Sequence, residues 1–288
     1  MVDPSSRHDG LQIDAVEVVH GRIDDLAGWI DDLHIRVARH REVMCGRPQV
    51  IEGLQVHSEG VDGVIQNNAF RVFSEPTPVT ETEQARQARR LAGGEVDGVS
   101  RQLARYVARI ADQYIVNLDA TMIYRLDRFG RGGHHRPFND AGFPAVRIME
   151  THENYRRQHQ DVRVENGIAY GDVIEGVNFE YAAKLTGVNV ATLASLAWAP
   201  APPTNVTIAG AVQPSTTLSW DPVPADNLAG YKVYWRDTTA PQWSHSRFIG
   251  SVTEFTLENL VIDNYLFGVA AVGADGNESV VSFPSRSR

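Results

Sequence analysis

A proline-rich stretch near residue 202 constrains the fold of this chain more than any other feature. Residues 199–204 read APAPPT, and proline lacks the backbone N–H that a continuing helix needs. Such a stretch is typical of an extended linker between domains. The 288 residues, of which 42% are hydrophobic, are enough for two cores, because single domains usually hold about 100 to 200 residues. The sequence therefore predicts two domains with a boundary near residue 202.

The part after the linker is predicted to be all-β. Short runs rich in Val, Leu, Thr, Tyr and Phe alternate there with turn signals such as Asp275-Gly276-Asn277, which is the spacing of a β-sandwich. Four of these runs resemble successive strands of a fibronectin type III domain: Thr217–Trp220, Gly230–Trp235, Phe255–Leu260 and Tyr265–Val272. The resemblance implies such a domain over residues 203–288.

Aromatic residues of this module have two kinds of predicted role. The resemblance implies that Trp220, Tyr231 and Tyr265 pack between the two sheets, where large aromatics bury much surface. Trp235 and Trp243 could instead form an exposed patch for a protein or polysaccharide, or pack against the neighbouring domain. A sandwich of this kind brings no catalytic group with it, so its expected role is binding or tethering.

The part before the linker is predicted to be an α/β layer. Leu103, Val107, Ile110 and Tyr114 repeat at helical spacing. Strands are predicted over Ile115–Tyr124 and Pro144–Ile148, and a last helix contains the apolar residues Tyr181, Leu185, Val188, Leu193 and Leu196. Glu81–Glu95 is expected to be a solvated helix or loop. The α/β segment is assigned to residues 60–200.

Residues 1–59 fit this scheme poorly and receive no fold. Two acidic pairs, Asp24-Asp25 and Asp31-Asp32, interrupt any long apolar period. Ile23, Leu26, Ile30 and Leu33 could form one short amphipathic helix. The single cysteine, Cys45, excludes an internal disulfide and is expected to be a buried thiol.

Three stretches of the α/β segment resemble the C-terminal part of a zinc aminopeptidase of metallopeptidase family 28. They are Tyr124–Phe138, Asn139–Arg147 and Glu153–Asp161. In that family a Gly-rich turn with Asp-His precedes a phenylalanine, Gly-Xaa-Pro-Ala-Val forms a strand, and a loop brings in a last metal-binding histidine. The resemblance extends over about residues 60–200, and a trailing fibronectin type III module is familiar in secreted bacterial enzymes of this kind.

The resemblance implies zinc as cofactor and His134, His135 and His159 as the candidate metal ligands. His135 matches the family's turn histidine, whereas His134 stands where the family usually has Asp. Four residues before Asp161, at the position of the last ligand, the chain has Arg157, a permanent cation that cannot bind zinc. No carboxylate occupies the expected ligand position near Val43–Gly46, and the sequence has no Glu-Glu pair. The three histidines could equally be polar turn and loop residues.

The net charge and the hydropathy of the sequence limit the kinds of partner that the chain is expected to bind. A formal net charge of -9 without a basic, aromatic-flanked cluster argues against nucleic acid. No apolar run approaches the roughly 20 residues of a membrane span, and no signal peptide is visible. Secretion or a periplasmic location is implied by the family alone. An incomplete sheet would also expose an edge, so the chain is expected to associate unless residues 1–60 cover it.

Two functions remain open at this stage. One is a zinc aminopeptidase-like protein acting on peptides, truncated and catalytically impaired because most ligands are missing; no catalytic residue is assigned. The other is a non-catalytic module that binds protein or carbohydrate on a surface or in a secreted protein.

Overall fold

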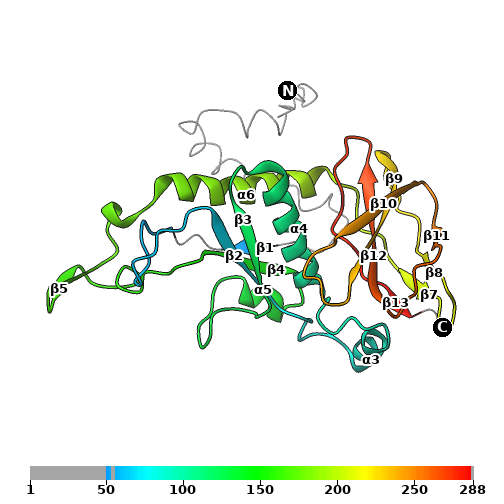
Figure 1. Ribbon diagram of the computed structural model, residues 1–288, viewed down its shortest axis with the longest axis horizontal. Helices are drawn as coiled ribbons and strands as arrows, with labels where there is room; N and C mark the ends of the chain where they lie inside the picture. The colour runs from blue at the N-terminus through cyan, green and yellow to red at the C-terminus, as the bar shows by residue number, and fades with distance from the viewer. Residues whose placement is uncertain (1–49, 53–55, 287–288) are drawn as a thin grey trace, which may run out of the picture.

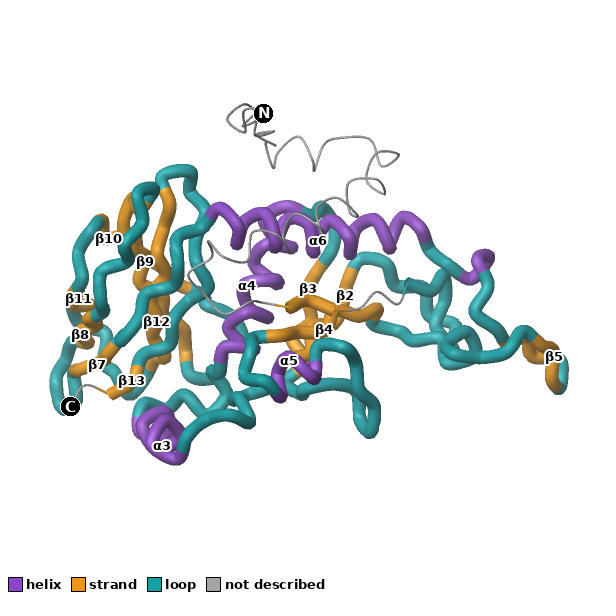
Figure 2. Tube along the Cα trace, turned by 180° about the vertical axis from the view of Figure 1, so that it is seen from behind, coloured by secondary structure: helices purple, strands orange, loops and turns teal. Residues whose placement is uncertain are grey.

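The computed structural model describes residues 50–52 and 56–286, which form an α/β layer followed by a β-sandwich (Figure 1). The predicted amphipathic helix at 23–33, Cys45 and the expected ligand position at 43–46 lie outside these residues. The two parts lie side by side along the long axis of the molecule, as the view from behind also shows (Figure 2).

The first part is built on a four-stranded mixed sheet with the order β1-β4-β2-β3. Its strands are β1 (Val50–Glu52), β2 (Ala69–Ser74), β3 (Asp119–Ile123) and β4 (Ala145–Glu150). β1 runs parallel to β4, β2 runs antiparallel to β4, and β3 runs parallel to β2. The sequence predicted that the α/β layer starts at residue 60. The sheet also includes β1, which precedes residue 60 and pairs with β4.

Two helices supply most of the apolar cover of this sheet. α4 (Val99–Tyr114) presents Leu103, Val107 and Ile110 to β2 and β4, and α6 (Phe179–Trp198) packs on α4. The predicted helices are thus present. The predicted strand at 115–124 is shorter, because Asn117 has a positive φ of 55° and turns the chain after α4, so that β3 starts only at Asp119.

The remaining elements of the first part are short and peripheral. α3 (Glu83–Leu91) has no buried residue, as expected for a solvated segment. α5 (Arg136–Asp140) lies directly before β4, and η2 (Ile174–Gly176) lies before α6. The hairpin of β5 (Arg163–Glu165) and β6 (Ile168–Tyr170) projects at the end of the molecule away from the sandwich (Figure 1).

The second part is a two-sheet antiparallel sandwich with one parallel edge pair. One sheet has the order β10-β9-β12 and the other the order β11-β8-β7-β13. The strands are β7 (Thr207–Ala209), β8 (Thr216–Ser219), β9 (Leu228–Asp237), β10 (His245–Gly250), β11 (Glu254–Leu257), β12 (Tyr265–Gly273) and β13 (Ser285–Arg286). This is the all-β architecture that the sequence predicted after the linker.

The sandwich core contains the predicted aromatic residues. Trp220 and Tyr231 are buried and meet edge to face at 5.3 Å between ring centroids. The Tyr231 hydroxyl accepts a hydrogen bond of 2.8 Å from the backbone of Val223, so its polar end is satisfied. Tyr265 is partly buried and packs against the same core.

A buried seam of ion pairs and hydrogen bonds joins the two parts. Asp97, just before α4, accepts hydrogen bonds from Arg105 of α4 at 2.6 Å and from Arg236 of β9 at 2.8 and 2.9 Å. The indole of Trp243 donates to Gln102 of α4 at 3.1 Å. Further along α4, the Tyr106 hydroxyl donates to the carbonyl of Glu278 at 3.0 Å. We call this set of residues the interdomain seam.

The two tryptophans of the sandwich, Trp235 and Trp243, have different surroundings. Trp243 packs against the neighbouring domain, and Trp235 stacks on His245 at 5.3 Å within the sandwich. Trp243 thus has the second of its two predicted roles, packing against the neighbouring domain, whereas Trp235 is partly exposed. In addition, no helix of the described residues is long and apolar enough to cross a membrane.

Candidate functional site

The three predicted metal-ligating histidines occupy different environments. His135 is fully buried at the N-terminus of α5, whereas His134 beside it is exposed. His159 is exposed in the loop before β5 and has a positive φ of 53°. Among residues 50–52 and 56–286, no group of three or more His, Cys, Asp or Glu side chains could hold a metal ion.

The buried ring of His135 faces a structural turn. Its Nε2 lies 2.9 Å from the carbonyl oxygen of Leu126 and 3.8 Å from a carboxylate oxygen of Asp127. Asp127 is itself 3.4 Å from the guanidinium of Arg147 on β4, which also donates to the carbonyl of Gly132 at 3.1 Å. His135 therefore helps to hold the loop between β3 and α5 onto the sheet.

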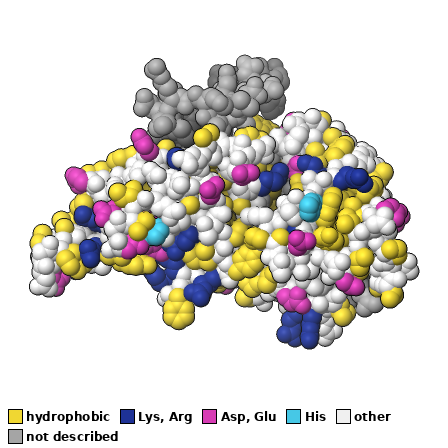
Figure 3. All heavy atoms as spheres, in the orientation of Figure 1, with side chains coloured by type: hydrophobic (Ala, Val, Ile, Leu, Met, Phe, Trp, Pro, Cys, Tyr) yellow, Lys and Arg dark blue, Asp and Glu magenta, His cyan; other side chains and the backbone are white. Residues whose placement is uncertain are grey.

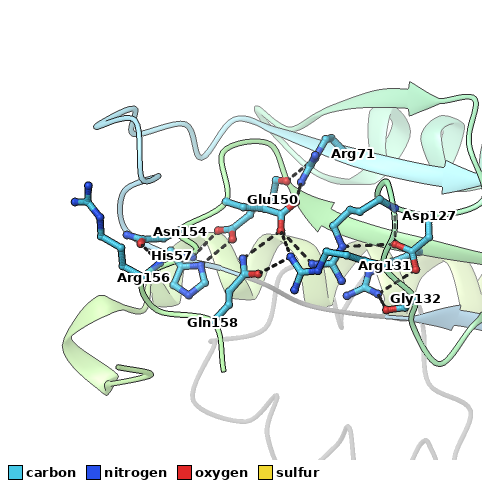
Figure 4. A network of polar contacts seen from close by, with 12 residues as sticks. His57, Arg71, Asp127, Arg131, Gly132, Glu150, Asn154, Arg156 and Gln158 are labelled. Atoms are coloured by element: carbon cyan, nitrogen blue, oxygen red, sulfur yellow. Dashed lines mark hydrogen bonds and ion pairs between the residues drawn. The ribbon is translucent and has the colours of Figure 1, made fainter. Parts of the chain in front are cut away.

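The carboxylate of Glu153 is the centre of a polar network in this region, and its partners Arg71, Arg131 and Gln158 are labelled in Figure 4. Glu153 follows β4 and is 6% exposed. It pairs with Arg71 of β2 at 2.6 Å, with Arg128 at 3.0 Å and with Arg131 at 3.4 Å. Gln158 donates to it at 3.2 Å and accepts from Arg131 at 3.2 Å. We call Glu153, its three arginines and Gln158 the Glu153 cluster.

The Glu153 cluster keeps its carboxylate ionised. Burial alone would raise the pKa of Glu153, but hydrogen bonds and charge from Arg71 and Arg128 outweigh burial and hold the pKa below its usual value. With its oxygens shared among three guanidinium groups and an amide, this carboxylate is not available as a metal ligand or a general acid.

A second carboxylate lies close by on β4. Glu150 accepts from the backbone N–H of His57 at 2.7 Å, and its other oxygen lies 2.7 Å from Nδ1 of the same histidine. Figure 4 shows His57 and Glu150 facing each other beside the Glu153 cluster, with the side chain of Arg156 pointing away. The pair ties the segment before β2 to the end of β4.

Arg157 stands where the resemblance to the family implies the last metal ligand. Arg157 is half-buried and donates to the carbonyl of Gly171 at 3.4 Å, close to the backbone bond between Gly171 and Arg156 at 3.0 Å. It thus fastens the loop to the base of the β5–β6 hairpin. The donor set of this region, guanidinium groups and carboxylates already paired with them, does not fit zinc.

A separate cavity lies at the interdomain seam. It has a volume of about 320 Å³ and is lined from α4 by Arg105 and Arg109, from β3 by Asp119, and from the sandwich by Tyr234 and Trp243. None of the three predicted histidines lines it. The cavity is therefore distinct from the Glu153 cluster and from the loop between β3 and α5.

The strand topology and the comparison with protein families agree on the fold class of the second part of the molecule, a β-sandwich. The model of the fibronectin type III domain matches residues 201–288. The chain therefore carries a fibronectin type III domain, and the preceding α/β layer is joined to it through the interdomain seam.

Most of the chain is similar to curated proteins named probable zinc metalloprotease. One from Pyrenophora teres f. teres is 44% identical over 266 residues, covering 86% of this chain and 55% of its own length. Another, from Leptosphaeria maculans, is 44% identical over 216 residues, covering 75% of this chain and 50% of its own length. The chain thus spans about half the length of these relatives. The predicted resemblance to zinc metallopeptidases is confirmed at this level.

Sequence reasoning missed the Glu153 cluster and the interdomain seam. Arg71, Arg128 and Glu153 are far apart in sequence, and only the sheet topology brings them together. One signal was available: Arg128 and Arg131 flank the same short loop in which the histidines were singled out. An arginine-rich loop on an acidic chain indicates internal carboxylate partners or an acidic ligand.

Proposed function

We propose that this chain is an aminopeptidase-like relative of zinc metalloproteases that is catalytically impaired and functions by binding protein or peptide. One observation carries the proposal: arginine occupies the region in which the resemblance places the last zinc ligand. Arg157 stands at the ligand position that the resemblance implies, and three further guanidinium groups pair with Glu153 of the same segment. A guanidinium neither binds zinc nor releases a proton near neutral pH.

The projecting and exposed parts of the α/β layer favour binding as its role. Phe129, in the loop between β3 and α5, is 87% exposed, and Val164 in the β5–β6 hairpin is 75% exposed. Exposed apolar side chains next to arginine are typical of protein interfaces. Secretion, as in the family that the chain resembles, is part of this proposal, and a polysaccharide ligand of the sandwich is its less favoured form because Trp243 packs inward.

Metal content and peptidase activity test the proposal together. The native full chain is purified without added zinc, its metal is measured by inductively coupled plasma mass spectrometry, and turnover of aminoacyl-p-nitroanilides is followed with and without a chelator. We expect neither stoichiometric zinc nor chelator-sensitive turnover. About two zinc ions per chain, together with turnover that a chelator abolishes, would refute catalytic impairment.

The variant Arg157→His is a useful companion. The described residues contain no group of three or more side chains that could hold a metal ion, so one added imidazole should not complete a zinc site there. We therefore expect the metal content and activity of the variant to equal those of the unchanged chain. If Arg157→His gained bound zinc and turnover, the remaining ligands would be present and the impairment would rest on this residue alone.

A further inference from the structure

The hairpin of β5 and β6 projects from the α/β layer at the end of the molecule away from the sandwich (Figure 1). All three residues of β5 are exposed, and the apolar side chain of Val164 at its centre is 75% exposed. Figure 3 shows hydrophobic, basic and acidic side chains together at this end of the molecule. A two-stranded hairpin is only marginally stable in water, so a further strand beside it would stabilise it.

The outer edge of β5 has no strand beside it. β5 and β6 form a sheet of their own, and among the described residues no other strand pairs with β5. On the β6 side, the backbone N–H of Gly171, directly after the strand, donates to the carbonyl of Arg156 at 3.0 Å. That side of the hairpin is therefore tied to the preceding loop, whereas the edge of β5 offers its peptide groups to another strand.

The turn of the hairpin determines which peptide groups face this edge. Asn166 and Gly167 have φ of 53° and 78°, as in the two-residue turns that suit a tight hairpin. The residues on either side of such a turn, Glu165 and Ile168, have peptide groups that point at each other, and this direction alternates along a strand. The N–H and C=O of Val164 therefore point outward, away from β6.

The order of charges along β5 is complementary to itself. Arg163 and Glu165 lie on the same face of the strand, on either side of Val164. Their side chains pair with each other at 3.1 Å but are 39% and 57% exposed, so both can reach a further partner. If two copies of β5 lie antiparallel with their Val164 residues opposite each other, Arg163 of each copy lies opposite Glu165 of the other. A parallel pairing in register would place like charges side by side, which is unfavourable.

We propose that β5 pairs antiparallel with β5 of a second copy of this chain about a two-fold axis at Val164, so that the two hairpins form one four-stranded sheet. The outward peptide groups of the two Val164 residues bond to each other, and each Arg163 lies opposite a Glu165 at the positions where side chains come closest. The two-fold axis closes the contact and limits the assembly to a dimer. Because few residues of each copy take part, the dimer is a reversible one. The inference is independent of whether the chain hydrolyses peptides.

A cysteine at the two-fold axis tests the register of the pairing. In the full chain carrying Cys45→Ser, which removes its one native cysteine, Val164→Cys puts two thiols on directly opposed residues. Their Cα atoms lie about 5.5 Å apart, within the range of a disulfide, so mild oxidation should give a covalent dimer on non-reducing electrophoresis. Val162→Cys is the matched control: Val162 is 74% exposed, but in this register its counterpart lies roughly 13 Å further along the strand. No covalent dimer with Val164→Cys, or an equal yield at both positions, would overturn the proposal.

Charge variants test whether Arg163 and Glu165 select the second copy as partner. Arg163→Glu and Glu165→Arg each bring like charges opposite each other, so each variant alone should dimerise about tenfold more weakly than the unchanged chain in sedimentation velocity at up to about 500 µM. In an equal mixture of the two variants, opposite charges face each other again, and the dimer should form as well as in the unchanged chain. This recovery separates contact between copies from loosening of the hairpin itself. A monomeric unchanged chain at every concentration, full dimerisation of either variant alone, or no recovery in the mixture would each contradict pairing through β5.

Discussion

At the residue scale, the Glu153 cluster shows how one buried carboxylate organises several loops. Glu153 connects Arg71 of β2 with Arg128 and Arg131 of the loop between β3 and α5. Removing one partner of a buried charge group costs more than the group contributes when intact, because the other charges remain desolvated. The cluster is therefore a structural anchor for the loop that carries Phe129.

The variant Glu153→Gln should lose stability in a pH-dependent way. The pKa of Glu153 is lowered in the folded chain, so its contribution is complete above the ordinary glutamate pKa and disappears as the pH falls through the lower folded value. At pH 7 we expect a loss of about 2–3 kcal/mol, less than for a fully buried group because Arg71 and Arg131 are partly solvated.

Urea denaturation of both chains between pH 7 and pH 3 measures this difference, which should shrink toward the acidic end. Glu165→Gln serves as the control because Glu165 and its partner Arg163 are exposed, and it should leave stability unchanged. A pH-independent difference between Glu153→Gln and the unchanged chain would show that the charge of Glu153 does not hold the cluster together.

The histidines show where sequence reasoning at this scale ends. His134 and His135 lie in the turn that leads into α5, before β4, and Arg157 donates to a backbone carbonyl. What the turn does with His135 could not be predicted, because the partner of its ring is the backbone carbonyl of Leu126. Every residue has a backbone carbonyl, so the type of residue 126 does not indicate that its carbonyl binds a histidine ring.

At the element scale, periodicity predicted the helices well and the strand ends less well. α4 and α6 follow from apolar residues at helical spacing, because each buries one row of side chains on the sheet or on the other helix. The first residues of the predicted strand at 115–124 are β-branched, yet they form the turn after α4. Tertiary context overrides strand propensity at such positions.

The start of α6 offers a test at this scale. The Asn178 side chain accepts a hydrogen bond of 3.0 Å from the backbone N–H of Tyr181 and so caps the helix. Asn178→Ala should cost about 1 kcal/mol, read as a lower urea midpoint. Asn178→Asp keeps an acceptor and adds a favourable charge at the helix N-terminus, so it should retain full stability. Equal losses in the two variants would contradict a capping role.

At the scale of the whole molecule, the interdomain seam makes the two domains one structural unit. Asp97 and the guanidinium groups of Arg105 and Arg236 are almost completely buried between them. Burial lowers the pKa of Arg236 and lowers that of Arg101 to about 10, and the nearby positive charge of Arg105 acts in the same direction. The sequence predicted an α/β part followed by a β-sandwich, but the interdomain seam joins residues of both parts and could not be predicted from either part alone.

Asp97→Asn should uncouple the domains. The substitution leaves two buried guanidinium groups without their counter-charge, and we expect a loss of about 3–5 kcal/mol. Differential scanning calorimetry should show one transition for the unchanged chain and two for the variant, because each domain has its own core. Asp226→Asn, an exposed change in the sandwich, is the control. A single, unshifted transition in Asp97→Asn would mean that the seam contributes little to cooperativity.

The seam also changes what the proline-rich linker can accomplish. A flexible linker normally allows two domains to move independently. Here Arg236 binds Asp97, just before α4, and Trp243 binds Gln102 of α4, so the two domains are held together. Hydrolysis of a peptide bond between residues 199 and 204 would therefore release no fragment. The two pieces would remain bound through the interdomain seam and would elute together in size-exclusion chromatography.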